Sequence, residues 1–166
     1  MDRRNFMHSV AAAALAASIP TVRAQTPVKQ SMVGQDSDGH PFDLADFKGK
    51  VCLVSFFTAA CTLCNHDLKL MREFYVDNRA KNFALIGVNV DAKHDDFVEY
   101  AHLISLSIPA PQRFPLVWRN APQHADTFGA VTRQPTHFVL NKAQELVFKR
   151  EGSFQPADWD LIWSKL

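Results

Sequence analysis

A nearly continuous apolar run, Val51–Phe57, lies three residues before the pair Cys61-Thr62-Leu63-Cys64. Such a run, rich in valine and phenylalanine, is typical of a strand covered on both faces of a sheet. From Cys61 to about Ala80, apolar side chains recur at spacings near three and four, which predicts a helix. A buried strand that leads directly into a Cys-X-X-Cys helix is the most specific structural feature of the chain, and it favours an α/β fold.

The remaining residues alternate between strand-like and helix-like patterns. Further strands are expected at 31–34, 40–44, 83–90 and 116–118, a hairpin at 136–140 and 145–149, and helices near 95–106, 122–128 and 156–166. Asp95 or Asp96 is expected to cap the helix that follows it. This order predicts a central mixed sheet with helices on both sides. The segment 31–34 is expected to be an edge strand of an N-terminal β extension.

Composition argues for one ordinary globular domain. The chain has 166 residues, of which 47% are hydrophobic and 21% charged, so a core of useful size can form. The formal net charge of +1 gives no indication of a nucleic-acid partner. Three cysteines are too few for a disulfide scaffold.

The first 24 residues are typical of a leader that is not part of the fold. The run Asp2–Met7 resembles the twin-arginine export signal, with Arg3 and Arg4 followed by apolar residues. The alanine-rich stretch 10–19 is too short to cross a bilayer core, which needs roughly 20 helical residues. We therefore expect a leader at 1–24, cleaved before Gln25, a tether at 25–30 and a periplasmic domain at 31–166. An uncleaved leader that serves as an anchor is the alternative.

The cysteine pair carries the clearest chemical signal. A thiolate attacks a disulfide, and the unpaired N–H groups and dipole of a helix start favour the thiolate form. Two cysteines three residues apart on a helix share one face, so the second can resolve the mixed disulfide that the first forms. We therefore assign Cys61 as the nucleophile and Cys64 as the resolving thiol, with no cofactor beyond their disulfide. Two structural cysteines are the alternative, and the lack of a second Cys-X-X-Cys excludes a Cys₄ zinc site.

Gln134-Pro135-Thr136 precedes the predicted strand at 136–140. Only about 5–6% of X–Pro bonds in folded proteins are cis, so the residues by themselves indicate a turn proline.

The chain resembles the TlpA/ResA branch of the thioredoxin-like proteins over roughly residues 31–166. The resemblance is carried by the cysteine pair and by five segments: Gly39–Leu44, Phe47–Lys50, Val51–Phe57, Gly87–Asp91 and Gln134–Leu140. It implies a thioredoxin-like fold and a cis Pro135 that faces the cysteines. It also implies that Gln134, Pro135 and Thr136 contact the substrate, whose extended backbone would be bound by β-augmentation.

The chain departs from the family pattern at three positions. Ala60 stands where the family usually has Trp, and Leu63 where it usually has Pro. Ser55, six residues before Cys61, stands where many members carry a buried polar residue, and a hydroxyl is a poor proton acceptor. The family's partners are often apocytochrome c or oxidase subunits, with a membrane-side electron donor. By this resemblance we expect a reductase of protein disulfides.

The cysteines are also compatible with two other functions. Cys61 and Cys64 together with His137 or His66 would suit a soft copper ion, which makes a copper-binding assembly factor the alternative function. Thr58-Ala59-Ala60-Cys61 also resembles the Thr-X-X-Cys of peroxiredoxins, which makes peroxide reduction a minor alternative. Cys52 lies on the predicted strand and is expected to be a buried structural residue.

Overall fold

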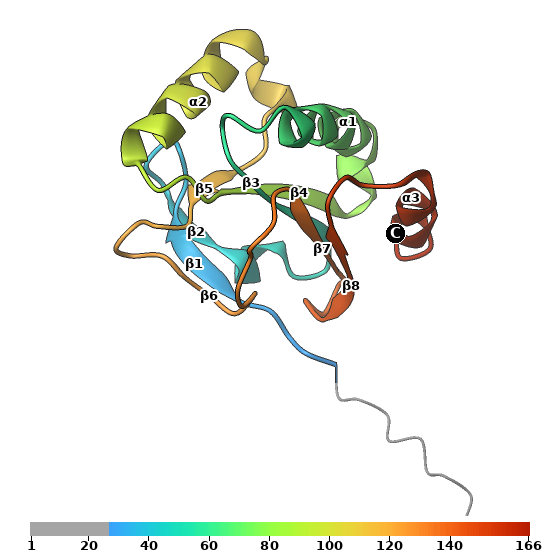
Figure 1. Cartoon of the computed structure of the whole chain (residues 1–166). Helices are drawn as coiled ribbons and strands as arrows, with labels where there is room; N and C mark the ends of the chain where they lie inside the picture. Colours follow the sequence, from blue (N-terminus) through green and yellow to red (C-terminus); the bar gives the residue numbers. More distant parts are fainter. Residues whose placement is uncertain (1–26) are drawn as a thin grey trace, which may run out of the picture.

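The computed structural model describes residues 27–166 and centres on a five-stranded sheet in the order β5-β4-β3-β7-β8 (Figure 1). The strands are β3 (Val51–Phe57), β4 (Phe83–Asn89), β5 (Leu116–Trp118), β7 (Thr136–Leu140) and β8 (Leu146–Glu151). β3, β4 and β5 are mutually parallel, and β7 and β8 run antiparallel to their neighbours. The predicted mixed sheet is therefore confirmed.

β3 is buried along its whole length because both faces of the sheet are covered. Its alternate residues Val51, Leu53 and Phe57 belong to one core cluster, and those between them belong to the other. This two-sided burial explains why β3 is apolar throughout and does not alternate with polar residues.

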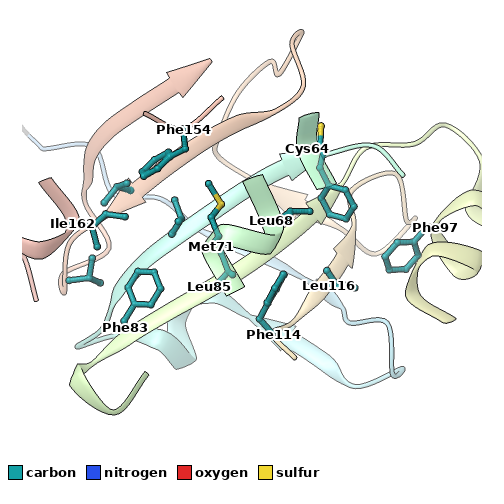
Figure 2. Packing of buried hydrophobic residues seen from close by; sticks show 14 residues of the cluster. Cys64, Leu68, Met71, Phe83, Leu85, Phe97, Phe114, Leu116, Phe154 and Ile162 are labelled. Atoms are coloured by element: carbon teal, nitrogen blue, oxygen red, sulfur yellow. The ribbon is translucent and has the colours of Figure 1, made fainter. Parts of the chain in front are cut away.

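The three α-helices pack against one face of the sheet. They are α1 (Thr62–Asn78), α2 (His94–Ser107) and α3 (Pro156–Trp163). Leu68 and Met71 from α1 and Ile162 from α3 share a core with the sheet (Figure 2). Helices were predicted on both faces, so this part of the expectation is wrong. The short 3₁₀ turns η2 (Arg79–Lys81) and η3 (Ala110–Gln112) connect the elements.

The second face is covered by a small sheet in the order β2-β1-β6 and by the 3₁₀ turn η1 (Leu44–Phe47). Its strands are β1 (Met32–Gln35), β2 (Pro41–Asp43) and β6 (Ala125–Asp126). β1 is central rather than an edge strand, because residues predicted as a helix at 122–128 supply β6 and pair with it. Arg119 fixes β6 by donating two hydrogen bonds, of 2.7 and 2.8 Å, to the Asp126 carboxylate.

The residues before β1 are attached to the domain. Gln30 is buried and its N–H donates to the Gln144 carbonyl at 2.9 Å, while the Leu146 N–H donates to the Val28 carbonyl at 2.9 Å. The tether predicted at 25–30 is therefore docked from Val28 onward. The expected leader at 1–24 lies outside the described residues.

Helix α2 begins after Lys93, which makes no side-chain capping bond, and not after the predicted cap Asp95 or Asp96. Both aspartates lie in the first turn, where negative charge interacts favourably with the helix dipole. No helix within residues 27–166 combines the length and the apolar character needed to span a bilayer.

Candidate functional site

The topology brings four chain segments to one edge of the large sheet. Because β3, β4 and β5 are parallel, their carboxyl ends meet there, and the antiparallel β7 begins at the same edge. Phe57 leads from β3 toward Cys61, Asp91 follows β4, and Pro135 precedes β7. Residues separated by more than seventy positions are thus placed at one end of the fold.

Cys61 and Cys64 are joined by a disulfide with an S–S distance of 2.09 Å. Cys61 is the N-cap residue of α1, and its Sγ accepts a hydrogen bond from the Cys64 N–H at 3.0 Å. Cys61 is partly exposed, whereas the Cys64 side chain is fully buried. An incoming thiol or disulfide can therefore reach the first sulfur but not the second.

The start of α1 favours a negative charge on Cys61. The first turn of this 17-residue helix contains no acidic side chain, so the unpaired N–H groups are not neutralised locally. A helix start stabilises an exposed anion by about 0.3–1 kcal/mol. This effect favours the thiolate form of Cys61 when the disulfide is reduced.

Two polar side chains hold the loop that presents Cys61. The Asp91 carboxylate accepts hydrogen bonds from the Ala59 N–H at 2.7 Å and from the Asn89 side-chain amide at 2.6 Å. On the other side, the Asn65 amide donates to the Ala59 carbonyl at 3.2 Å. Sequence reasoning did not assign Asp91 or Asn65 a role, although a carboxylate directly after a buried strand was visible in the sequence.

The Gln134–Pro135 peptide bond is cis, as the family resemblance implied. The Pro135 carbonyl accepts a hydrogen bond from the Gly152 N–H at 2.8 Å, and the Thr136 hydroxyl donates to the Arg133 carbonyl at 2.6 Å. Pro135 and Thr136 are buried, and Gln134 is half-buried. Substrate contact through these three residues stays a prediction.

Asp67 is a buried carboxylate on α1 that sequence reasoning missed. It accepts hydrogen bonds from the Ser153 hydroxyl at 2.6 Å and the Phe154 N–H at 2.9 Å, and its Oδ2 lies 3.2 Å from His137 Nε2. Burial by itself would raise the pKa of Asp67, but the hydrogen bonds from His137, Ser153 and Phe154 lower it below its usual value. The available signal was a charged residue three positions after Cys64, on the same helix face.

His137 and Ser55 form a buried polar pair beneath α1. They are cross-strand partners in the β3–β7 register, and both side chains are fully buried. Because the ionised Asp67 can only accept, His137 Nε2 donates in this contact. Neither His137 Nδ1 nor the Ser55 hydroxyl has a hydrogen-bond partner within residues 27–166.

The residues considered for copper binding, Cys61 and Cys64 with His137 or His66, do not form a cluster of ligand atoms in the described chain. In the described chain, the group of His, Cys, Asp and Glu whose ligand atoms all lie within 4.8 Å consists of Asp36, Asp38 and His40, far along the chain from the cysteines. His137 is directed to Asp67 and Phe154, and His66 is exposed. The geometry thus gives no support to a copper site formed by the cysteines with these two histidines.

Cys52 is buried and free, as predicted for a structural residue. Burial raises the pKa of its thiol to about 12, so the reactive thiolate form is scarce at neutral pH.

Near the other end of β3, the backbone carbonyl of Thr58 accepts a hydrogen bond from the Cys61 N–H at 3.2 Å. The hydrogen bonds to Cys61 within residues 27–166 all involve backbone groups as the other partner.

Comparisons with known proteins agree with this geometry. Residues 21–149 match the model of the AhpC/TSA family. The thiol-disulfide oxidoreductase ResA of Bacillus thuringiensis subsp. konkukian is 23% identical over 122 residues, which cover 74% of this chain and 66% of that protein. ResA of Geobacillus kaustophilus is 25% identical over 111 residues, which cover 67% of this chain and 60% of that protein. The chain thus spans less than two thirds of the length of these curated relatives.

Solved structures support the predicted fold. A thiol:disulfide interchange protein of the thioredoxin family from Chlorobium tepidum TLS superposes with a TM-score of 0.66 at 22% identity, covering 86% of this chain and 97% of that one. StoA from Bacillus subtilis superposes with a TM-score of 0.60 at 18% identity, covering 83% and 99%. The fold is therefore thioredoxin-like, as expected from the sequence.

Replacing Asp67 by Asn tests the role of this carboxylate. The amide nitrogen of Asn cannot accept the hydrogen bonds that now converge on Asp67, so we expect the free energy of unfolding at pH 7 to fall by about 1–3 kcal/mol. Because the native pKa is lowered, the stabilisation is present above the unfolded pKa and is lost as pH falls through the native value. The difference between wild type and D67N in urea denaturation should therefore shrink at acidic pH. Asp77→Asn, at an exposed position of the same helix, should change stability little, and an equal loss in both variants would contradict the role assigned to Asp67.

Proposed function

We propose that this chain, which belongs to the AhpC/TSA family and has a thioredoxin-like fold, exchanges disulfides with partner proteins through Cys61 and Cys64. The observation that carries the proposal is the asymmetry of the pair: Cys61 is accessible at the start of α1, and Cys64 is buried one turn behind it. The relatives named as thiol-disulfide oxidoreductases support the same activity.

The exchange proceeds in two steps in the reductive direction. The Cys61 thiolate attacks one sulfur of the partner disulfide, which forms a mixed disulfide and releases one partner thiol. Cys64 then loses its proton and attacks Cys61, which closes the protein disulfide and releases the second thiol. Two electrons and two protons pass to the partner, and an external dithiol donor must restore the reduced pair. No cofactor other than the Cys61–Cys64 disulfide is needed.

Substrate backbone would bind at the edge formed by the cysteines and the cis-proline segment. Gln134, Pro135 and Thr136 directly precede or begin β7, at the same end of the sheet as Cys61. The Gly152 N–H occupies the Pro135 carbonyl, so an extended partner segment would pair with the backbone of Gln134. Apocytochrome c and oxidase subunits are the partner proteins suggested by the family resemblance.

The resolving thiol needs a proton acceptor inside the domain, because Cys64 is sealed from solvent. Asp67 follows Cys64 by three residues and shares its helix face. It accepts the hydrogen bond of His137 Nε2, and His137 Nδ1 is buried with no hydrogen-bond partner within residues 27–166. We infer that His137, oriented by Asp67, receives the proton that leaves Cys64.

Substituting the cysteines tests the two-step mechanism. Cys61→Ser should abolish reduction of a protein disulfide, because the attacking sulfur is gone. Cys64→Ser should accumulate mixed disulfides with partners, which non-reducing electrophoresis detects, because the second step is blocked. Cys52→Ala removes a buried cysteine and serves as the control with normal turnover. Full turnover by Cys64→Ser would be incompatible with the mechanism.

Replacing His137 by Leu tests the proton acceptor. We expect resolution of a preformed mixed disulfide to slow by about tenfold or more at pH 7, since general-base help is typically worth at least 10²-fold. The deficit relative to wild type should shrink as the pH rises, because hydroxide increasingly removes the proton in place of the missing base. His66→Gln, on the exposed side of α1, should leave the pH–rate profile unchanged. A uniform loss at every pH would mean that His137 has only a structural role.

Export is tested in the full-length chain. We propose that the leader at 1–24 directs the folded domain to the periplasm through Arg3 and Arg4. The double change Arg3→Lys/Arg4→Lys should leave the protein in the cytoplasmic fraction, because the twin-arginine pattern is lost. Arg23→Lys, outside the pair, is the control. Unchanged export of the double variant would exclude the twin-arginine route.

A further inference from the structure

A groove with a volume of about 340 Å³ lies directly beside Cys61. One wall is formed by the loop residues Ala59 and Ala60, immediately before the reactive cysteine, and the other by α2 between Asp96 and Leu103. Ala60 occupies the position where the family usually has Trp, and this small side chain lines the groove next to Cys61 in the chain. A partner residue flanking the target cysteine would therefore be placed in this groove.

Two side chains from α2 give the groove an apolar, uncharged part. Tyr100 and Leu103 line it, and the Tyr100 ring packs on Phe57 with ring centroids 4.9 Å apart. Burial raises the pKa of Tyr100 to about 12, so its hydroxyl is neutral at physiological pH. Leu103 is 53% exposed, which makes it an apolar surface available for a partner side chain.

The charged side chains that line the groove are all negative. Asp91, Asp96 and Glu99 line it, and no lysine or arginine does. Asp91 is already occupied by the Ala59 N–H and the Asn89 amide. Asp96 and Glu99 are exposed and take part in no salt bridge within residues 27–166. Their charges are therefore available to an incoming cation.

We propose that this groove selects partner segments that carry a lysine or arginine next to the cysteine that Cys61 attacks. The aliphatic stem of such a side chain would lie along Tyr100 and Leu103, and its charged head would reach Asp96 and Glu99. A purely apolar side chain would leave the two carboxylates unused, and an acidic one would be repelled. This inference rests on the proposed disulfide exchange and adds the chemistry of the preferred partner.

Asp96 also has a structural role, because it lies in the first turn of α2 together with Asp95. Asp95 has the same charge and the same turn but does not line the groove. Comparing substitutions of Asp96 and Asp95 therefore distinguishes a loss of helix stability from a loss of partner binding. Glu99, one turn further along, gains less from the helix dipole.

The test compares reduction of short peptides in which one cysteine, flanked by Lys or by Glu, forms a disulfide with 2-mercaptoethanol. The quantity measured is the ratio of second-order rate constants, Lys peptide over Glu peptide, for the reduced protein. In D96N/E99Q we expect this ratio to fall by about fivefold relative to wild type, as two exposed ion pairs allow. The ratio in wild type should also fall at high salt. The control D95N/D77N, which removes the same charge outside the groove, should keep the wild-type ratio.

The outcomes separate this inference from the proposed function. Equal ratios in wild type and D96N/E99Q would contradict the proposed selectivity of the groove, because the intrinsic reactivity of the two peptides would then explain any preference. A similar fall in D95N/D77N would also overturn it, since overall charge would suffice. If reduced wild type fails to reduce even uncharged bis(2-hydroxyethyl) disulfide, the proposed disulfide exchange itself is wrong.

Discussion

The burial of β3 on both faces is the constraint on which the rest of the structure depends. Its seven residues are sealed between the helical layer and the small sheet, so the strand cannot shift register without exposing apolar side chains. The residues that follow are placed at one edge of the sheet as a result. The chemistry of Cys61 therefore depends on a rigid strand, with the loop at its end held by Asp91 and Asn65.

A single loop after β8 connects the two halves of the site. Gly152 binds the carbonyl of Pro135, and the next two residues, Ser153 and Phe154, bind the carboxylate of Asp67. The helix that carries the cysteines and the cis-proline segment are thus fixed by three consecutive residues. The Asp67 carboxylate, whose pKa is lowered by these hydrogen bonds, also contacts His137 at 3.2 Å and so orients its ring. Structural and chemical roles are combined in one buried network.

The sequence predicted the elements with the strongest patterns. β3, α1 and the cysteine pair follow from continuous burial, helical periodicity and spacing, and the cis form of Pro135 followed from the family resemblance. The errors lie where long-range pairing decides the structure: β6 forms because β1 offers it a free side, although residues 122–128 alone favoured a helix. Asp67 and Asp91 were missed because their partners lie up to 87 residues away along the chain, and the positions of these carboxylates in the sequence do not identify those partners.

The docking of Val28 and Gln30 onto the turn after β7 determines where the N-terminal segment leaves the domain relative to Cys61. That turn lies at the amino-terminal end of β3, whereas Cys61 follows its carboxyl-terminal end. Anything joined ahead of Val28, whether a bead, a fluorescent protein or a lipid surface, is therefore attached at the pole opposite the reactive sulfur. A protein immobilised through its N-terminus would therefore expose the Cys61–Cys64 disulfide on the side away from the attachment.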